Sequence, residues 1–198
     1  MDNINNIAVI IRNGGIGVFP TDTVYAIGCS ALDDEALKRL YEIRRRPQNK
    51  PLLIHIAGAD QLSGLVRDIP PTARQLINKY WPGPLTLIFK RNPDTISNLV
   101  SAGLDTVAVR WPDCQIEIEL IKQAGTPLVA PSANPSGETP ALNISQARQY
   151  FGNNCDFYLD NGTCSTGQVS TILDISKDTP ILLRSGRIAL SAEEYMIK

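Results

Sequence analysis

Two kinds of hydrophobic spacing alternate along the chain, and each kind predicts a different element. Apolar residues three or four apart are typical of an amphipathic helix, whereas short apolar runs bounded by turn residues are typical of buried strands. Helical spacing predicts helices over residues 3–13, 59–66, 72–80, 115–124, 145–151 and 191–197. Apolar runs predict strands over residues 16–19, 52–56, 85–89, 106–110, 126–130, 156–160, 169–175 and 181–184. Because the two kinds alternate in a mixed order, we expect an α/β fold with a twisted, mostly mixed or parallel sheet flanked by helices.

A further helix, opening at Asp33, leads into the densest cluster of positive charge in the chain. Asp33 is a suitable N-cap, and the apolar stripe behind it consists of Leu37, Leu40 and Tyr41. Four cations then follow within seven residues: Arg44, Arg45, Arg46 and Lys50. Pro47 and Pro51 exclude helix here, so the cations lie on a helix end and on a loop that feeds the next strand. Such groups suit phosphate oxygens. A helix C-terminus also favours cations, because they stabilise its negative dipole end. For this stretch alone, a phosphate-binding cluster and a solvated basic helix end therefore both stay open.

The net charge of the chain limits the kind of ligand that it is expected to bind. The 198 residues predict one domain over residues 1–198. The net charge is -1 and the pI is about 5.8, whereas a general nucleic-acid binder is usually basic. A local basic cluster in a nearly neutral chain favours a small anionic ligand, with a local RNA-facing patch left open. No run approaches the roughly 18 apolar residues of a membrane span, and the polar N-terminus is not a signal peptide.

The cysteines and the single histidine argue against a protein-held metal. The four cysteines have no C-x-x-C spacing, and one histidine does not suffice for the usual two-histidine sites. We therefore expect reduced cysteines in a cytoplasmic protein and no metal ligands. His55 lies within an apolar strand, which favours a structural role over that of a triad base.

Several catalytic motifs are absent from the sequence. There is no P-loop pattern and no G-x-S-x-G elbow, and the glycines at 14–17 precede a strand instead of following one. What remains is a set of phosphate and hydroxyl binders near strand ends, where α/β sheets commonly bind ligands. They are the cluster 44–50, Arg110, the segment Ser132–Asn134 between prolines, and Arg184 with Arg187. Each is weak alone, since such residues are also common in turns and at solvated strand ends.

Seven blocks, taken together and in this order, resemble the YrdC family of threonylcarbamoyl-AMP synthases, of the TsaC type. They are PTDTVYAIG (20–28), RRRPQNKPLLIHI (44–56), YWPGPLTLIF (80–89), TVAVRWP (106–112), APSANPSG (130–137), STILDIS (170–176) and LLRSGRI (182–188). The resemblance runs from about residue 7 to 190. It implies a YrdC-like fold with a deep concave nucleotide cavity, in the short bacterial form without a second domain after residue 198. Arg44 departs from the pattern, because the family usually has lysine there, and Ala26 replaces a usual glycine.

The resemblance also implies an activity. Members of the family join ATP, L-threonine and bicarbonate into L-threonylcarbamoyl-AMP and release pyrophosphate, and Mg²⁺ is expected to accompany ATP. The product feeds threonylcarbamoylation of tRNA adenosine 37 by a separate TsaD-containing complex. By resemblance, the ATP-binding residues are Arg46, Lys50, Thr106, Ser132, Pro140 and Arg184. The threonine-binding residues are Thr23, His55, Arg110, Ala130 and Ser170. The catalytic positions are Arg46, Lys50, Ser132 and Asn134.

Two alternatives to this activity stay open. One is a module that binds double-stranded RNA or tRNA, against which the acidic overall balance argues. The other is a YrdC-like paralogue with a different acceptor, for which the arginine at position 44 is the hint.

Overall fold

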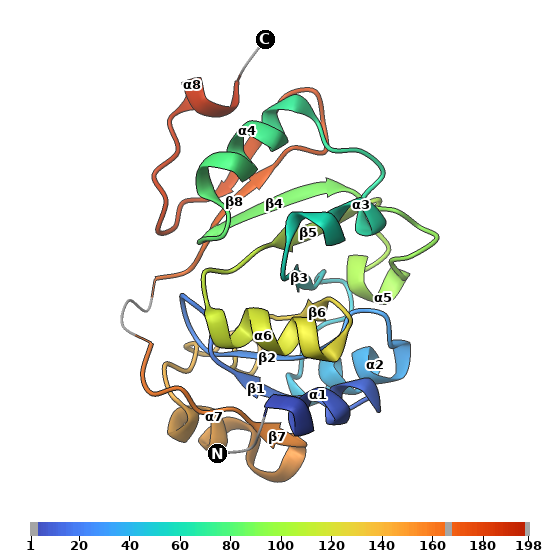
Figure 1. Ribbon diagram of the computed structural model, residues 1–198, viewed down its shortest axis with the longest axis vertical. Coiled ribbons are helices and arrows are strands. Elements are labelled where there is room, and N and C mark those ends of the chain that lie inside the picture. Colours follow the sequence, from blue (N-terminus) through green and yellow to red (C-terminus); the bar gives the residue numbers. More distant parts are fainter. Residues whose placement is uncertain (1–3, 165–167, 197–198) are drawn as a thin grey trace.

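A mixed sheet runs through the protein, whose computed structural model describes residues 4–164 and 168–196 (Figure 1). Its strands are β1 Gly17–Phe19, β2 Ala26–Ser30, β3 Leu53–His55, β4 Leu85–Lys90, β5 Thr106–Arg110, β6 Leu128–Val129, β7 Phe157–Tyr158, β8 Thr171–Asp174 and β9 Ile181–Arg184. Within the described residues the nine strands are ordered β7-β1-β2-β6-β3-β5-β4-β8-β9. The pairs β1–β7, β3–β5 and β4–β8 are parallel and the others antiparallel, which confirms the expected mixed α/β sheet.

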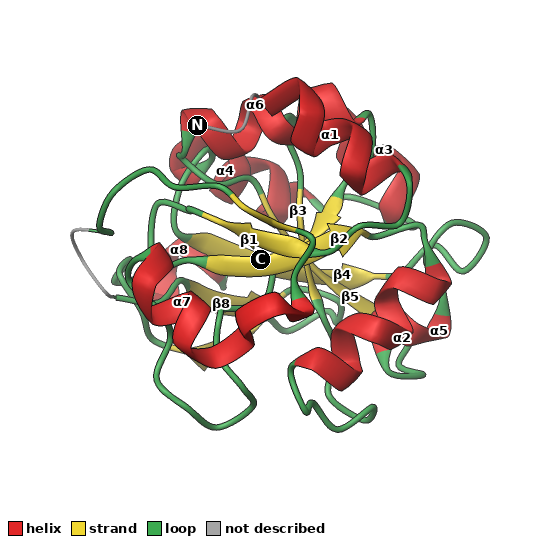
Figure 2. Cartoon of the chain, turned by 90° about the horizontal axis from the view of Figure 1, so that it is seen from below, coloured by secondary structure: helices red, strands yellow, loops and turns green. Residues whose placement is uncertain are grey.

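Helices cover both faces of this sheet (Figure 2). They are α1 Ile4–Arg12, α2 Asp34–Ile43, α3 Leu62–Leu65, α4 Pro71–Tyr80, α5 Asn98–Ser101, α6 Gln115–Ala124, α7 Ile144–Phe151 and α8 Ala192–Tyr195, with 3₁₀ turns at Ala59–Gln61 and Gly152–Asn154. Helices α1 and α6 share one buried apolar cluster, and α2 and α5 contribute to a larger one. Asp33 caps α2 as expected, because its carboxylate accepts from the backbone N–H groups of Glu35 and Ala36.

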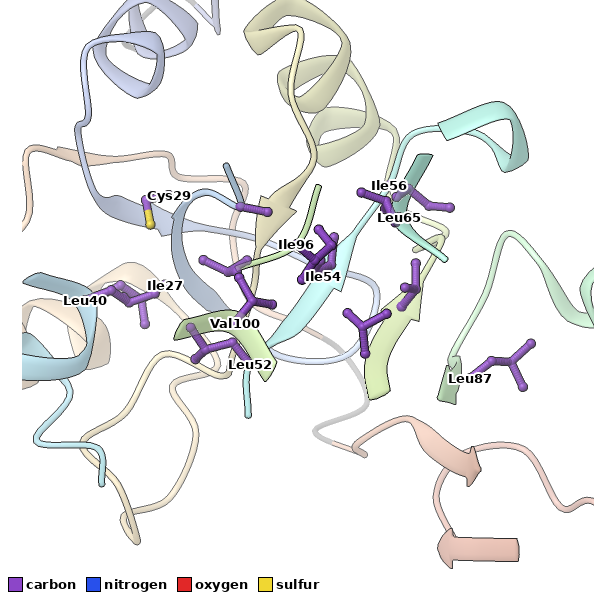
Figure 3. Close-up of a cluster of buried hydrophobic side chains, with 14 of the residues drawn as sticks. Ile27, Cys29, Leu40, Leu52, Ile54, Ile56, Leu65, Leu87, Ile96 and Val100 are labelled. Atoms are coloured by element: carbon purple, nitrogen blue, oxygen red, sulfur yellow. The ribbon is translucent and has the colours of Figure 1, made fainter. Parts of the chain in front are cut away.

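The larger cluster anchors the central strand β3. Leu52, Ile54 and Ile56 are fully or almost fully buried and pack with residues such as Ile27 and Val100 (Figure 3). Side chains alternate between the two faces of a strand. Burying Ile54 on one face therefore turns Leu53 and His55 toward the other.

Three features differ from the sequence-based prediction. Strand β2 was not predicted, because its sequence AIGCS contains a glycine and only short apolar runs. Gly28 is required there, since a Cβ at this position would lie 1.9 Å from the Val129 carbonyl oxygen. The helix predicted over 59–66 is a 3₁₀ turn followed by the short α3, and the four-residue α5 was not predicted. Residues 3 and 197, at the ends of two predicted helices, lie outside the described residues.

Candidate active site

One face of the sheet is hollowed into a cavity of about 300 Å³, which is within the range of small-molecule sites. Residues two apart on neighbouring strands form its floor, because such residues share a face. They are Leu53 and His55, Thr86 and Ile88, Ala108 and Arg110, and Ser170 and Ile172. The strand register agrees, since Ala108 lies beside both Leu53 and Ile88. The walls come from Thr21, residues 23–26, Arg44, Arg46, residues 51–52 and 130–132, Val169, Leu183 and Arg184.

The end of α2 brings two arginines to one end of this cavity, which we call the cationic end (Arg44 and Arg46). The N–H of Arg46 donates to Tyr41 O and that of Arg45 to Glu42 O, both at 2.9 Å. This is the Schellman pattern, in which the residue after the C-cap is left-handed and is usually glycine. Here it is Arg45, with φ 49°. The reversal leaves Arg45 exposed while both neighbouring side chains line the cavity.

Arg44 is a buried cation without an anionic partner among the described residues. Its side chain is almost fully buried, its Nε donates to Asn134 O at 3.2 Å, and its Nη1 has no hydrogen-bond partner there. Burial, with the neighbouring Arg46, lowers the pKa of Arg44 to about 10. An unpartnered buried charge is costly, so a guanidinium held in this way is suited to an anionic ligand.

Arg46 and Lys50 are placed differently, although the sequence groups them. Arg46 lines the cavity and donates to two backbone oxygens, from Nη2 to Pro51 O at 2.7 Å and from Nε to Lys50 O at 3.2 Å. Burial lowers the pKa of Arg46. The Lys50 side chain is exposed and lies outside the cavity lining. The backbone of Lys50 therefore orients Arg46, while its ammonium group stays in solvent.

Arg110 dominates the opposite end of β3, which we call the paired end (Thr23, His55, Arg110 and Ser170). Its Nε donates to Gly83 O at 2.9 Å and its Nη1 to Thr23 Oγ1 at 3.2 Å. Its Nη2 forms an ion pair with Asp22, and both of these side chains are buried. The guanidinium is thus fixed in orientation and its charge is balanced within the protein.

Hydroxyl groups continue this hydrogen-bond network across the sheet. The Oγ atoms of Thr86 and Ser170 share a hydrogen bond of 2.8 Å. Arg184, at the rim, donates from Nη2 to Ser170 Oγ at 3.0 Å and from Nε to Ser170 O at 2.9 Å. Ser170 therefore joins β4 and β9 at the mouth of the cavity.

A histidine–carboxylate pair lies beneath the paired end. His55 Nδ1 is 2.5 Å from Glu117 Oε1, and Glu117 on α6 is fully buried. Burial raises the pKa of Glu117, against the opposing effects of His55 and Arg110. His55 is thus buried in the sheet, as the sequence indicated, and it also lines the cavity.

The structure brings together most, though not all, of the residues that the resemblance assigned. The cavity lining includes Thr23, Arg46, His55, Arg110, Ala130, Ser132, Ser170 and Arg184. Outside the lining are Lys50, Thr106, Asn134 and Pro140. Thr106 precedes Ala108 by two residues on the same face of β5, so it extends the floor. Asn134 is buried, and its amide donates to Pro135 O at 2.7 Å and to Glu138 O at 2.9 Å, which holds the loop after β6.

Three residues at the site were not among the predicted ones: Asp22, Thr86 and Glu117. Glu117 carries a readable signal, since it shares the buried stripe of α6 with Leu120, Ile121 and Ala124. A carboxylate on an apolar helix face calls for a buried partner. Asp22 and Thr86 give no such signal, because polar residues are common in turns and exposed strands.

Neither a metal cage nor a membrane span is found in the described part of the chain. Across residues 4–164 and 168–196, no three His, Cys, Asp or Glu side chains are grouped so that they could hold a metal ion. No helix in the same ranges is long and apolar enough to cross a membrane. The four cysteines are free thiols.

The fold and the cavity together define an α/β protein with a cavity of small-molecule size, positively charged at one end and rich in hydroxyl groups at the other. Residues 9–186 match the Sua5/YciO/YrdC family, which is described as "Telomere recombination". The chain belongs to this family.

Individual relatives agree with this assignment. The threonylcarbamoyl-AMP synthase of Pyrococcus abyssi is 40% identical over 190 residues, which cover 96% of this chain and 56% of that protein. The Bacillus subtilis protein of the same name is 38% identical, with 96% and 55% covered. The crystal structure of P. abyssi Sua5 complexed with L-threonine has a TM-score of 0.90 and covers 92% of this chain and 54% of that one. E. coli YciO has a TM-score of 0.85 at 25% identity, with 97% and 92% covered. The chain thus spans about half the length of the two curated relatives.

Proposed function

We propose that the protein is an L-threonylcarbamoyladenylate synthase, which condenses ATP, L-threonine and bicarbonate and releases pyrophosphate. The observation that carries the proposal is that the residues assigned to threonine and most of the cations assigned to the nucleotide line one and the same cavity. The names of the curated relatives, and the L-threonine in the P. abyssi structure, support the same reaction. Residues 1–198 act in this proposal as one YrdC-like domain.

The reaction has two bond-forming steps. The threonine amine is first carboxylated to a carbamate, and a carbamate oxygen then attacks the α-phosphate of ATP while pyrophosphate leaves. Adenylyl transfer needs in-line placement and neutralised phosphate charge more than a nucleophilic side chain. The cationic end supplies that charge, since Arg44 and Arg46 have no carboxylate partner in the described residues.

The ATP site combines this charge with the loop after β6. In the proposal Arg46, Lys50 and Arg184 hold the phosphates, and Ser132 and Asn134 contribute to catalysis. Lys50 reaches the phosphates in this proposal by rotating its side chain from its exposed position toward the cavity. Thr106 and the Pro140 backbone complete the nucleotide site.

The threonine site lies at the paired end. Thr23, His55, Arg110, Ala130 and Ser170 enclose the amino acid in the proposal. In the proposal the hydroxyl and imidazole groups of the site form hydrogen bonds with the side-chain OH of threonine. The site discriminates against an analogue without this OH, because these polar groups would then lack a partner. The charge of Arg110 is balanced by its ion pair with Asp22. In the proposal Arg110 is the arginine partner of the threonine carboxylate, and Arg184 remains assigned to the phosphates.

Magnesium fits this site as a companion of the nucleotide. The charged side chains of the cavity lining are arginines, which do not ligate Mg²⁺. We propose that the ion is bound by the phosphate oxygens and water, and that the cations of the cavity neutralise the charge that remains.

The product has a specific destination in this proposal. A TsaD-containing complex in the cytoplasm would transfer the threonylcarbamoyl group to tRNA adenosine 37. Direct contact of this chain with tRNA would occur at Arg45 and Lys50, whose side chains are exposed.

The proposal is tested by pyrophosphate release with mass detection of the adenylate. Purified protein receives ATP, magnesium, bicarbonate and L-threonine, and each is omitted in turn. We expect release that depends on both threonine and bicarbonate, together with threonylcarbamoyl-AMP. ATP binding without this product would contradict the proposal and would favour a paralogue with another acceptor.

A further inference from the structure

The buried His55–Glu117 pair has unpartnered polar atoms beside the cavity, whose lining includes His55. The two side chains are 2% and 0% exposed, and their short contact joins Nδ1 to Oε1. Neither His55 Nε2 nor Glu117 Oε2 has a hydrogen-bond partner among the described residues. Buried polar atoms nearly always have partners. A histidine nitrogen left open in a cavity wall is therefore a candidate contact for a ligand.

The surrounding charges leave the Glu117 carboxylate uncompensated. Arg110 is the nearest cation across the strand pair, but it already forms an ion pair with Asp22. Asp22 adds a like charge that raises the pKa of Glu117 further. The thiols of Cys114 and Cys164 lie within the influence of both carboxylates, and burial raises the pKa of both thiols. They are therefore neutral near pH 7 and supply no charge.

A positive charge on the ligand would restore the balance. An ionised carboxylate in this environment is stable only with a cation close by. An ammonium group at His55 Nε2 would be such a cation, placed one imidazole ring away from Glu117. Arg44 and Arg46 of the cationic end lie at the other end of β3, so the cavity separates a place for an ammonium group from a place for phosphates.

We propose that Glu117 is a positioning residue, which holds the His55 Nδ1–H toward its own carboxylate and thereby presents the Nε2 lone pair to the threonine ammonium group. This inference rests on the proposed function. His55 Nε2 takes one proton from R–NH₃⁺, which leaves R–NH₂ and an imidazolium. The amine lone pair forms the N–C bond with bicarbonate, and water leaves to give R–NHCOO⁻. The positive charge moves from ligand to ring but stays beside the carboxylate, which stabilises the imidazolium.

The tautomer can be observed directly, because the chain has a single histidine. We would record the imidazole ¹⁵N signals of histidine-labelled protein for wild type, Glu117→Gln and Glu119→Gln. Glu119 is the matched control, since it lies on α6 and bonds Gln123 instead. Above pH 8 we expect the Nδ1–H form in wild type and in the control, and a mixture of tautomers in Glu117→Gln. Adding L-threonine should shift the Nε2 signal. An Nε2–H tautomer in wild type would overturn the inference, as would an Nε2 signal that threonine leaves unchanged.

Kinetics separate positioning from a purely structural role. If wild type makes the adenylate, His55→Gln and Glu117→Gln should lower kcat by about 100-fold at pH 7, with KM for ATP unchanged. Activity should recover as pH rises, because more threonine then has a neutral amine before it binds. A loss that is equal at every pH would contradict the inference. If Glu117→Gln does not fold, Glu117→Asp, which shortens the reach, serves in its place. Absence of product from wild type would contradict the proposed function. The tautomer of His55 measured by NMR would still decide the role of Glu117.

Discussion

The two ends of the cavity hold their arginines in opposite ways. At the paired end, Arg110 has hydrogen bonds to Gly83 and Thr23 and an ion pair with Asp22. At the cationic end, Arg44 has one hydrogen bond, to a backbone carbonyl, and an unpartnered Nη1 among the described residues. A neutralised, fixed guanidinium shapes a pocket, whereas an unpaired one attracts an anion. The difference shows that the protein itself balances the charge at the paired end and leaves the charge at the cationic end unbalanced among the described residues.

This comparison predicts that the largest stability loss comes from the paired end. Arg110→Ala leaves Asp22 buried without its cation, which should lower the free energy of unfolding by about 3–5 kcal/mol. Denaturant unfolding monitored by circular dichroism would measure it. The double variant Arg110→Met with Asp22→Asn removes both charges and should recover part of the loss. Equal losses in the single and double variants would mean that the ion pair is not the cause.

At the cationic end we expect loss of activity with little loss of stability. Arg46→Ala and Lys50→Ala should each lower adenylate formation at least about tenfold, because both remove charge from the phosphate site. Their unfolding curves should match that of wild type. Near-wild-type turnover in both variants would remove the phosphate assignment. A loss in Arg46→Ala alone would restrict it to the arginine that lines the cavity in this structure.

Ser170 tests the hydroxyl network of the paired end with a smaller effect. Ser170→Ala removes one hydroxyl and its bonds to Thr86 and Arg184, so KM for threonine should rise several-fold, a change of about 1 kcal/mol. Initial rates over a threonine series at saturating ATP would measure it. A change confined to KM for ATP would place Ser170 with the nucleotide instead.

The smallest expected effect concerns the turn that builds the cationic end. Arg45→Gly relieves a left-handed residue at φ 49°, so it should stabilise the fold by about 0.5–1 kcal/mol. The Arg45 side chain is exposed and outside the cavity, so adenylate formation should not change. Denaturant unfolding, with Arg45→Ala as the control that keeps a Cβ, would test this. A destabilised glycine variant would show that the side chain supports the turn.

The same contrast explains what could be predicted from the sequence. The cationic end is local, since Arg44 and Arg46 belong to one cluster of cations at residues 44–50 between a helix and a strand, and turn residues mark both ends of that cluster. The mixed α/β sheet was likewise predictable, because alternating helical and strand spacing requires it. Strand β2 was not, because Gly28 serves a backbone contact with Val129 that hydrophobic spacing does not record.

The paired end depends on contacts between distant segments. Asp22 forms an ion pair with Arg110. Glu117 contacts His55, and these two residues are 62 apart in the sequence. Spacing within one segment does not indicate such partners. Glu117 is the exception. A carboxylate on the buried stripe of α6 indicates that it has a buried partner, although the sequence does not indicate which residue that partner is.

The most direct test of the account is a calorimetric cross-titration of the two ends. ATP and L-threonine would be titrated separately into wild type, Arg46→Ala and Ser170→Ala. The account predicts that Arg46→Ala weakens ATP binding and leaves threonine binding unchanged, whereas Ser170→Ala weakens threonine binding more than ATP binding. If both variants weaken both ligands equally, the cavity does not divide into a phosphate end and a threonine end, and the central claim is wrong.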